Sequence, residues 1–355
     1  MRNRTLATAY AVFCTLLLIV GAVVCFPFAW QDGTIAMLET VAGLLVGVIL
    51  APIVHELGHL AFAKAVGMEI AYVKMFCFAW IRRGKKLCFR MVSPFAPDET
   101  QAVLKTGENV KKRAIKYTLG GLVFGGVLWT VLLAASILVT LLAKCNYALW
   151  GMSIYTGYLF LLNVLPLEYV SGKTDALIYR GIQKEDDAEK VMLSAMYIQG
   201  ELFAGKTYGE IDESYYFDLP VLAEDEPLFA VITELRYRYC VDRENLEEAA
   251  KYINRLASLQ EYLTDEQMQR VCAELVFMHA LNGDLERAEE CAKPCKAFLS
   301  GQTATAKRVL ATFTKAFDET EKAQILAQSG LELLENEWIA GERAWEEKLL
   351  SRLQS

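Results

Sequence analysis

Four long apolar runs fill the first half of this 355-residue chain and limit what it can fold into. Each run is long enough to cross a lipid bilayer as a helix. The first half is also basic and the remainder acidic, with 15 Lys and Arg against 8 Asp and Glu in residues 1–170 and 21 against 35 afterwards. We therefore expect an all-α membrane domain of about four spans in residues 1–180 and a soluble α-helical domain in residues 181–355. The runs cover residues 6–29, 40–66, 118–143 and 147–167.

Most of the positive charge lies between the second and third runs. Residues 64–116 hold 12 Lys and Arg against 4 Asp and Glu, and short loops of this kind stay in the cytoplasm. The second run then enters the cytoplasm and the third leaves it, so both chain ends are cytoplasmic. We expect an integral protein of a prokaryotic plasma membrane. The first run is too long for a signal peptide, and no small-x-small cleavage site follows it.

Glycines and a patch of strand-forming residues indicate how the apolar half packs. Gly43 and Gly47, and likewise Gly121 and Gly125, stand four residues apart, a spacing that lets helices approach closely. We expect the two pairs to pack together, with homodimerisation through the same faces as the alternative. Residues 70–92 are rich in aromatic and β-branched side chains around a basic turn, which predicts a small β-hairpin insertion. This hairpin either offers an edge to an extended peptide or packs on the bilayer surface.

The second apolar run contains a pattern that suits a metal ion. His55 and His59 are four residues apart, so on a helix both imidazoles project from one face and can reach the same ion. Glu56 lies close enough to act as a general base on water there. Only three histidines occur in the chain, and such polar groups in lipid are costly unless they have a function. The pattern predicts His55 and His59 as metal ligands and Glu56 as a catalytic residue.

A third ligand is needed, because a catalytic zinc ion takes three protein ligands and leaves one position open for water. The second and fourth runs end on the same side of the membrane, so the segment after the fourth run can fold back to the histidines. Two carboxylates lie there, Glu168 and Asp175. The residues alone favour neither, since Asp175 could instead cap a helix and Glu168 could be a solvated interfacial acid.

Several features together resemble the site-2 protease family of intramembrane zinc metalloproteases. They are the His-Glu-Leu-Gly-His pattern, the glycine-rich third run, and Asn163 and Pro166 followed by an aspartate. The resemblance covers residues 40–180 and implies that Asp175 is the third zinc ligand. It also implies that Asn163 lies near the substrate carbonyl, where its amide can donate to a developing oxyanion. The alternative for Asn163 is an amide at a helix end that bonds its own backbone.

The resemblance implies an intramembrane zinc metalloprotease that cuts near the cytoplasmic face. Its substrate would be a single-span membrane protein or a membrane-associated peptide, and an edge of the 70–92 hairpin would hold the cut segment extended. One alternative is a membrane-anchored zinc peptidase acting on soluble peptides, with Glu168 or a later acid as third ligand. A second is a non-catalytic membrane adaptor. We expect no nucleic-acid partner, because the acidic half has no basic patch interleaved with aromatic residues.

A short motif recurs in the acidic half. Residues 245–250 are echoed by residues 283–288 and more weakly by residues 318–323, and the marker alanines of these motifs are 39 and 35 residues apart. Helix pairs at such a period resemble tetratricopeptide repeats, which implies a concave face for a peptide or protein partner. A helical bundle without repeats is the alternative.

Overall fold

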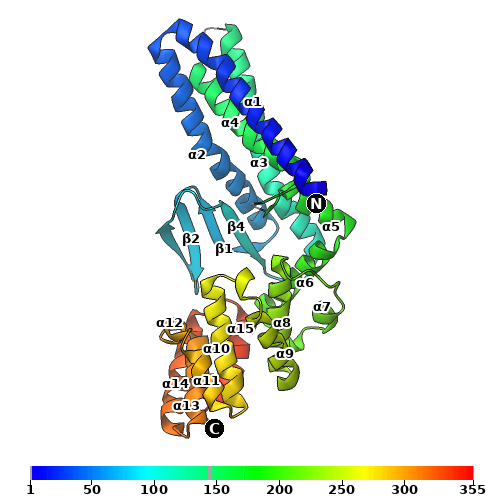
Figure 1. Cartoon of the computed structure of the whole chain (residues 1–355), viewed down its shortest axis with the longest axis vertical. Coiled ribbons are helices and arrows are strands. Elements are labelled where there is room, and N and C mark those ends of the chain that lie inside the picture. The colour runs from blue at the N-terminus through cyan, green and yellow to red at the C-terminus, as the bar shows by residue number, and fades with distance from the viewer. Residues whose placement is uncertain (1, 143–144, 171, 355) are drawn as a thin grey trace. The chain divides into compact units, whose positions relative to one another are not determined.

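The chain divides into two compact units in a computed structural model that describes residues 2–142, 145–170 and 172–354 (Figure 1). The main division falls at Asp186, near the predicted boundary at residue 180. Two short segments from the region between the second and third apolar runs group with the second unit. The first unit comprises Met1–Arg82, Leu87–Val103 and Lys111–Asp186, and the second comprises Arg83–Lys86, Leu104–Val110 and Asp187–Ser355.

Among the described residues, three helices are long and apolar enough to cross a membrane. They are α1 (Arg2–Asp32), α2 (Thr34–Ala65) and α3 (Val110–Leu142). The fourth run forms α4 (Tyr147–Val164), a shorter helix of 18 residues that packs against α1 and α2. That α4 crosses a membrane stays a prediction. The last residue of the predicted third run, residue 143, lies outside the described residues. Many Leu and Val side chains of α1 to α3 are exposed, as side chains that face lipid are.

The predicted pairing of the glycines on the second and third runs is wrong. Gly43 and Gly47 pack instead against α4, where a Cβ atom on Gly43 would lie 2.2 Å from the carbonyl oxygen of Ala148. On α4, a Cβ atom on Gly151 would lie 2.6 Å from the carbonyl oxygen of Thr40 on α2. Small residues on both sides therefore bring the backbones of α2 and α4 into contact.

The predicted β-hairpin is part of a larger, four-stranded sheet. Strands β1 (Met68–Met75) and β2 (Phe78–Arg83) pair antiparallel, and the strand order is β3-β2-β1-β4, with β3 at Lys86–Met91. The fourth strand, β4 (Glu99–Leu104), was not predicted. Its polar start, Glu-Thr-Gln, resembles the rest of the basic loop, and its place in the sheet depends on contacts with β1.

One aspartate holds the approach to β4 beside β1. Asp98 Oδ1 accepts hydrogen bonds from Lys74 Nζ and from the backbone N–H of Phe76, both at 2.7 Å. The Lys74 side chain is buried and also donates to the carbonyl oxygen of Ala96 at 2.6 Å. These charge-assisted bonds fix the loop from which β4 begins.

The connection after α4 carries the chain back toward α2. It contains a two-stranded hairpin, β5 (Glu168–Tyr169) and β6 (Gly172–Lys173), followed by α5 (Asp175–Lys184). Thr174 closes the base of this connection: its hydroxyl donates to the carbonyl oxygen of Leu165 at 2.8 Å and accepts from the N–H of Leu177. Thr174 is therefore the N-cap of α5, and Asp175 is the first helical residue rather than the cap.

The second unit is helical. Its core contains buried aromatic and aliphatic residues from most of its helices. Short 3₁₀ helices lie at Tyr208–Glu210, Gln260–Tyr262 and Leu334–Asn336. The α-helices are α6 (Asp187–Ala204), α7 (Ser214–Phe217), α8 (Pro227–Asp242), α9 (Leu246–Ala257), α10 (Asp265–Leu281), α11 (Leu285–Ala292), α12 (Lys296–Leu299), α13 (Ala304–Ala316), α14 (Thr320–Leu333) and α15 (Ala340–Ser351).

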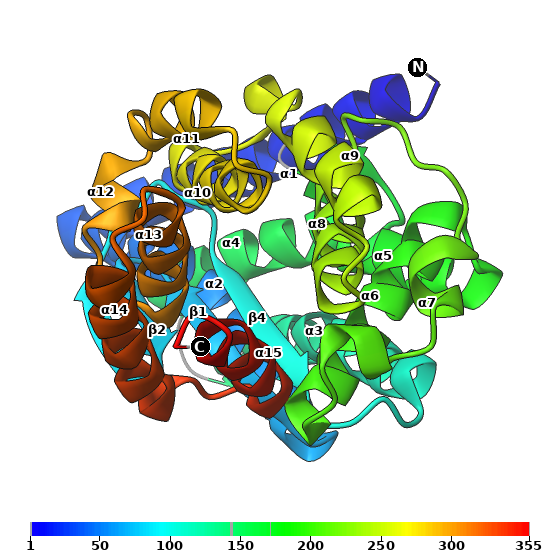
Figure 2. The same ribbon diagram turned by 90° about the horizontal axis from the view of Figure 1, so that it is seen from below.

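Three helix pairs of this unit, α8–α9, α10–α11 and α13–α14, share one local design. In each pair, the turn between the helices contains one residue with positive φ, and the second helix fully buries an alanine five residues later. Figure 2 shows the pairs following one another around an arc. The recurring motif therefore marks a repeated helix–turn–helix, while the likeness to tetratricopeptide repeats stays a prediction. The turn residues are Glu244 (61°), Gly283 (73°) and Asp318 (62°), and the alanines are Ala249, Ala288 and Ala323.

A buried ion network joins four helices of the second unit. Arg308 on α13 is fully buried; its Nε donates to Glu346 Oε2 on α15 at 2.8 Å and its Nη2 donates to Glu274 Oε1 on α10 at 2.6 Å. Tyr237 on α8 donates to the other oxygen of Glu274 at 2.8 Å. The carboxylates of Glu274 and Glu346 therefore both depend on Arg308, a cation that is itself buried.

Replacing Arg308 with methionine should destabilise the chain strongly. Glu274 and Glu346 would be left buried without their cation, and breaking such a pair typically costs about 3–5 kcal/mol. We expect this loss in the free energy of unfolding, measured by denaturant titration of the full chain in detergent. The control is Arg287→Met, because Arg287 is largely exposed; its effect should stay within about 0.5 kcal/mol. Equal effects of the two substitutions would contradict the prediction.

Candidate metal centre

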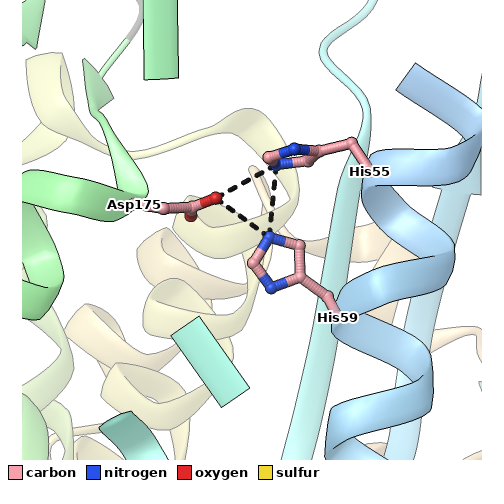
Figure 3. A group of neighbouring side chains, drawn as sticks. All are labelled: His55, His59 and Asp175. Carbon is pink, nitrogen blue, oxygen red and sulfur yellow. Dashed lines mark hydrogen bonds and ion pairs between the residues drawn. The ribbon is translucent and has the colours of Figure 1, made fainter. Parts of the chain in front are cut away.

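The two histidines of α2 meet a carboxylate from α5. His55 Nε2 and His59 Nε2 lie 3.3 Å apart, and Asp175 Oδ2 lies 3.1 Å from the first and 3.2 Å from the second (Figure 3). The three side chains form a group that could hold a metal ion. The His59 side chain is 10% exposed and those of His55 and Asp175 are 15% exposed, so the group is sheltered but not sealed from water.

A backbone carbonyl fixes which nitrogen of His59 can bind an ion. His59 Nδ1 lies 3.0 Å from the carbonyl oxygen of Tyr117 on α3. That oxygen only accepts hydrogen bonds, so Nδ1 carries the proton, and the Nε2 of a neutral ring presents a lone pair. This lone pair faces His55 and Asp175. A ring that donates one N–H to a carbonyl and offers its other nitrogen to a shared point is the usual arrangement of a metal-binding histidine.

Asp175 contributes negative charge that faces the two imidazoles. Burial by itself raises the pKa of the Asp175 carboxyl, yet the neighbouring imidazoles of His55 and His59 hold this pKa well below its usual range. The buried Oδ2 faces the Nε2 atoms of His55 and His59 at 3.1 and 3.2 Å. A carboxylate oxygen and two imidazole nitrogens that face one point offer the donor set that a divalent cation takes.

Two glycines of α3 make room for this arrangement. A Cβ atom on Gly58 of α2 would lie 2.2 Å from the carbonyl oxygen of Gly120, so the two backbones touch one residue before His59. The next residue, Gly121, faces the histidines: its Cβ would lie 2.5 Å from His55 Nε2 and 2.5 Å from His59 Nε2. Any side chain at Gly121 would therefore fill the space that an ion and its open coordination position need.

Glu56 lies beside the metal group and is held by a residue from the sheet. Its side chain is buried, and Oε2 accepts a hydrogen bond of 2.6 Å from the hydroxyl of Thr100 on β4. Thr100 is tied in turn to α3, because the hydroxyl of Tyr117 donates to its carbonyl oxygen. A buried carboxylate beside a metal group can take up and return a proton, which is the part a general base plays in hydrolysis.

The other residues considered from the sequence lie elsewhere. Asn163, near the end of α4, donates from Nδ2 to the carbonyl oxygen of Leu159 at 3.2 Å. This is the local contact that the sequence left as its alternative, so the geometry gives no support to an oxyanion role for Asn163. Glu168 lies opposite Lys173 in the strand register of the β5–β6 hairpin. Of the two acids that the residues alone left open, Asp175 is the one that lies with both histidines.

Three residues of the site were missed by sequence reasoning. Thr100 is 44 positions from Glu56 and lies in a strand that was not recognised, so no spacing rule connects the two. Tyr117 follows the basic residues 64–116, and no spacing in the sequence links it to the histidines. Gly121 was noticed, but its spacing from Gly125 suggested helix packing rather than space beside a metal ion.

Two imidazoles and a carboxylate around one point, with a buried glutamate next to them, suit metal-assisted hydrolysis. The same donor types also occur in sites that bind other divalent metals. Comparisons with protein-family models, with curated proteins and with solved structures found no match to this chain.

Proposed function

We propose that the chain is an intramembrane zinc metalloprotease that hydrolyses a peptide bond in a membrane-spanning or membrane-adjacent substrate near the cytoplasmic face. The observation that carries the proposal is that Asp175 of α5 meets His55 and His59 beside Glu56. The two histidines and Glu56 lie on α2, a helix apolar enough to cross a membrane. A purely structural or adaptor role has no use for the buried Glu56 carboxylate next to these ligands.

The spacing of the three donor atoms supports zinc. Ligands about 2.0–2.1 Å from a tetrahedral zinc ion stand about 3.3–3.4 Å from one another. The three distances here, 3.1, 3.2 and 3.3 Å, are close to that edge length. Three protein ligands with one side lined by Gly121 also match a catalytic site, which keeps a position open, rather than a closed structural site.

Each residue of the site has a definite task in this proposal. His55, His59 and Asp175 hold the zinc ion, which when bound lowers the pKa of water toward ~7 and polarises a carbonyl group. Glu56 accepts a proton from the attacking water and returns it to the leaving amine. The burial of Glu56 keeps bulk water from competing for that proton.

The sheet gives the proposal a place for an extended substrate. A helical segment hides its backbone, so it must unwind before a peptide bond can be cut, and an edge strand can hold the unwound segment through main-chain hydrogen bonds. The sequence suggested an edge of the 70–92 hairpin. We now favour β4 (Glu99–Leu104), because it lies at the end of the sheet order and its Thr100 contacts Glu56.

The second unit would recruit or gate the substrate in this proposal. Its repeated helix pairs enclose a cavity of about 340 Å³ that is lined mainly by α8, α9 and α10. Curved stacks of helix pairs commonly bind peptides or proteins on such a face. We propose a protein or peptide partner there.

The third ligand can be tested separately from catalysis. We expect Asp175→Ala to bind zinc at least about 10-fold more weakly than wild type, while Glu168→Ala keeps one zinc ion per chain. The measurement is metal analysis of the detergent-purified proteins after dialysis against a weak chelator. Loss of zinc only in Glu168→Ala would overturn the ligand assignment and favour a site of different geometry.

The direct test of the function is cleavage. The zinc-loaded chain in detergent should cut at least one protein from a panel of single-span membrane proteins, a chelator should stop the reaction, and added zinc should restore it. A zinc-loaded chain that cuts none of them, or cuts equally well after the zinc has been removed, would contradict the proposal.

A further inference from the structure

The Glu56 side chain needs a partner to aim it. Three χ angles separate its carboxylate from the backbone of α2, so the helix alone does not fix where the two oxygens lie. In the structure one oxygen, Oε2, accepts from the Thr100 hydroxyl at 2.6 Å, and both residues are buried. A short bond from a hydroxyl to a carboxylate in a dry site is strong and directional.

The Thr100 hydroxyl donates to a distant side chain, whereas two buried threonines on helices, Thr40 and Thr156, donate to their own backbones. Buried threonines on a helix commonly donate to their own backbone, as Thr156 does to the carbonyl oxygen of Met152 at 2.9 Å. Thr100 instead reaches across 44 positions of sequence to a single carboxylate. Its hydroxyl therefore serves Glu56 rather than its own strand.

Thr100 is itself held from the other side. The hydroxyl of Tyr117 donates to the carbonyl oxygen of Thr100, and the carbonyl oxygen of Tyr117 faces His59 Nδ1 at 3.0 Å. A closed path of hydrogen bonds thus leaves α2 at His59, passes through α3 and β4, and returns to α2 at Glu56. The metal ligand and the proposed base are thereby held in one rigid frame.

We propose that Thr100 is the positioning residue of Glu56 and that Tyr117 anchors Thr100; this rests on the proposed function of the site. The bond to Oε2 restricts rotation of the carboxylate and leaves the second oxygen for the proton of the attacking water. The Thr100 hydroxyl does not bind the metal ion in this role, and a substrate strand on β4 would be held by main-chain groups, which a change of the side chain leaves in place. Removal of the hydroxyl should slow the chemical step and leave metal binding and substrate binding as they were.

The test compares Thr100→Val, which keeps the shape and removes the hydroxyl, with Thr100→Ser, which keeps the hydroxyl. We expect kcat of Thr100→Val to fall about 10-fold to 100-fold, the cost of a misplaced group, with KM within about twofold of wild type. Thr100→Ser should restore kcat to within about threefold. All variants should keep one zinc ion per chain, and the matched control Thr156→Val should keep wild-type kcat.

A double variant decides whether Thr100 acts through Glu56. In the Glu56→Gln background, Thr100→Val should cause no further loss, because the group that it positions can no longer serve as a base. Tyr117→Phe should lower kcat less than Thr100→Val does. The role is overturned by wild-type kcat in Thr100→Val, by a lack of rescue in Thr100→Ser, or by an equal further loss in the double variant.

The controls also separate this role from the proposed function. If Glu56→Gln is inactive while Thr100→Val is fully active, the protease proposal stands and the positioning role fails. If the wild type cleaves nothing, the proposed function fails and the positioning role fails with it. If Glu56→Gln cleaves as fast as wild type, Glu56 is not the base and the positioning role fails, while the cleavage activity itself stands. Loss of zinc from Thr100→Val would show that the residue supports the metal group instead, which also overturns the role.

Discussion

Gly121→Ala should empty the metal site. The added methyl group would lie 2.5 Å from the Nε2 atoms of both His55 and His59, well inside the contact distance of a carbon and a nitrogen atom. Either the histidines turn away from each other or the ion has no space, and both outcomes remove ligands. We expect zinc affinity to fall by at least about 100-fold, the upper end of what changes around a metal site usually cause.

The matched control lies one turn further along α3. A Cβ atom on Gly125 would lie 3.8 Å from His55 Nδ1, an ordinary contact, so Gly125→Ala should keep one zinc ion per chain. Metal analysis after dialysis gives the comparison, and circular dichroism of both variants checks that the helices persist. Full zinc content in Gly121→Ala would mean that the ion does not lie between these histidines and α3.

Glu56→Gln should slow cleavage strongly and keep the metal ion. The amide has nearly the shape of the carboxylate but cannot accept a proton from water, and loss of a general base typically costs about 10²- to 10⁴-fold in kcat. His55, His59 and Asp175 are untouched, so zinc content should stay at one ion per chain. The measurement is the rate of substrate cleavage at saturating substrate, alongside metal analysis of the same sample.

Glu39→Gln provides the matched control for this change. Glu39 lies on the same helix, but its side chain is exposed, so the same substitution there should leave both the rate and the zinc content as in wild type. A Glu56→Gln variant that keeps the wild-type rate would rule out Glu56 as the base. Loss of zinc from this variant would instead show that Glu56 supports the ligands.

The parts of the site that the sequence predicts are those governed by local spacing. His55 and His59 follow from the four-residue repeat of a helix face, since that geometry needs no knowledge of the rest of the fold. Asp175 was one of two candidates, because the length of the connection after α4 allows either acid to reach α2. The position of Asp175 beside α2 depends on the hydrogen bonds of Thr174 to Leu165 and Leu177 and on the β5–β6 hairpin. No periodicity in the sequence reveals these contacts.

The contacts between distant segments were beyond prediction from one sequence. Thr100 reaches Glu56 only because β4 joins a sheet whose other strands precede it, and that joining depends on Asp98 and Lys74. The glycine pairs show the same limit: their spacing predicts close packing but does not name the partner helix. Gly43 meets α4 and Gly121 faces the histidines, and both outcomes were decided by tertiary structure.

The position of Asp175 at the start of α5 has a consequence for how the protein is made. Asp175 leaves the ribosome 116 residues after His59, an interval of about 6 to 23 s at typical rates of synthesis. Throughout that time the nascent chain carries two imidazoles whose acidic partner has not yet been translated. The three side chains of this group can therefore meet only after α1 to α4 and the β5–β6 hairpin have been synthesised.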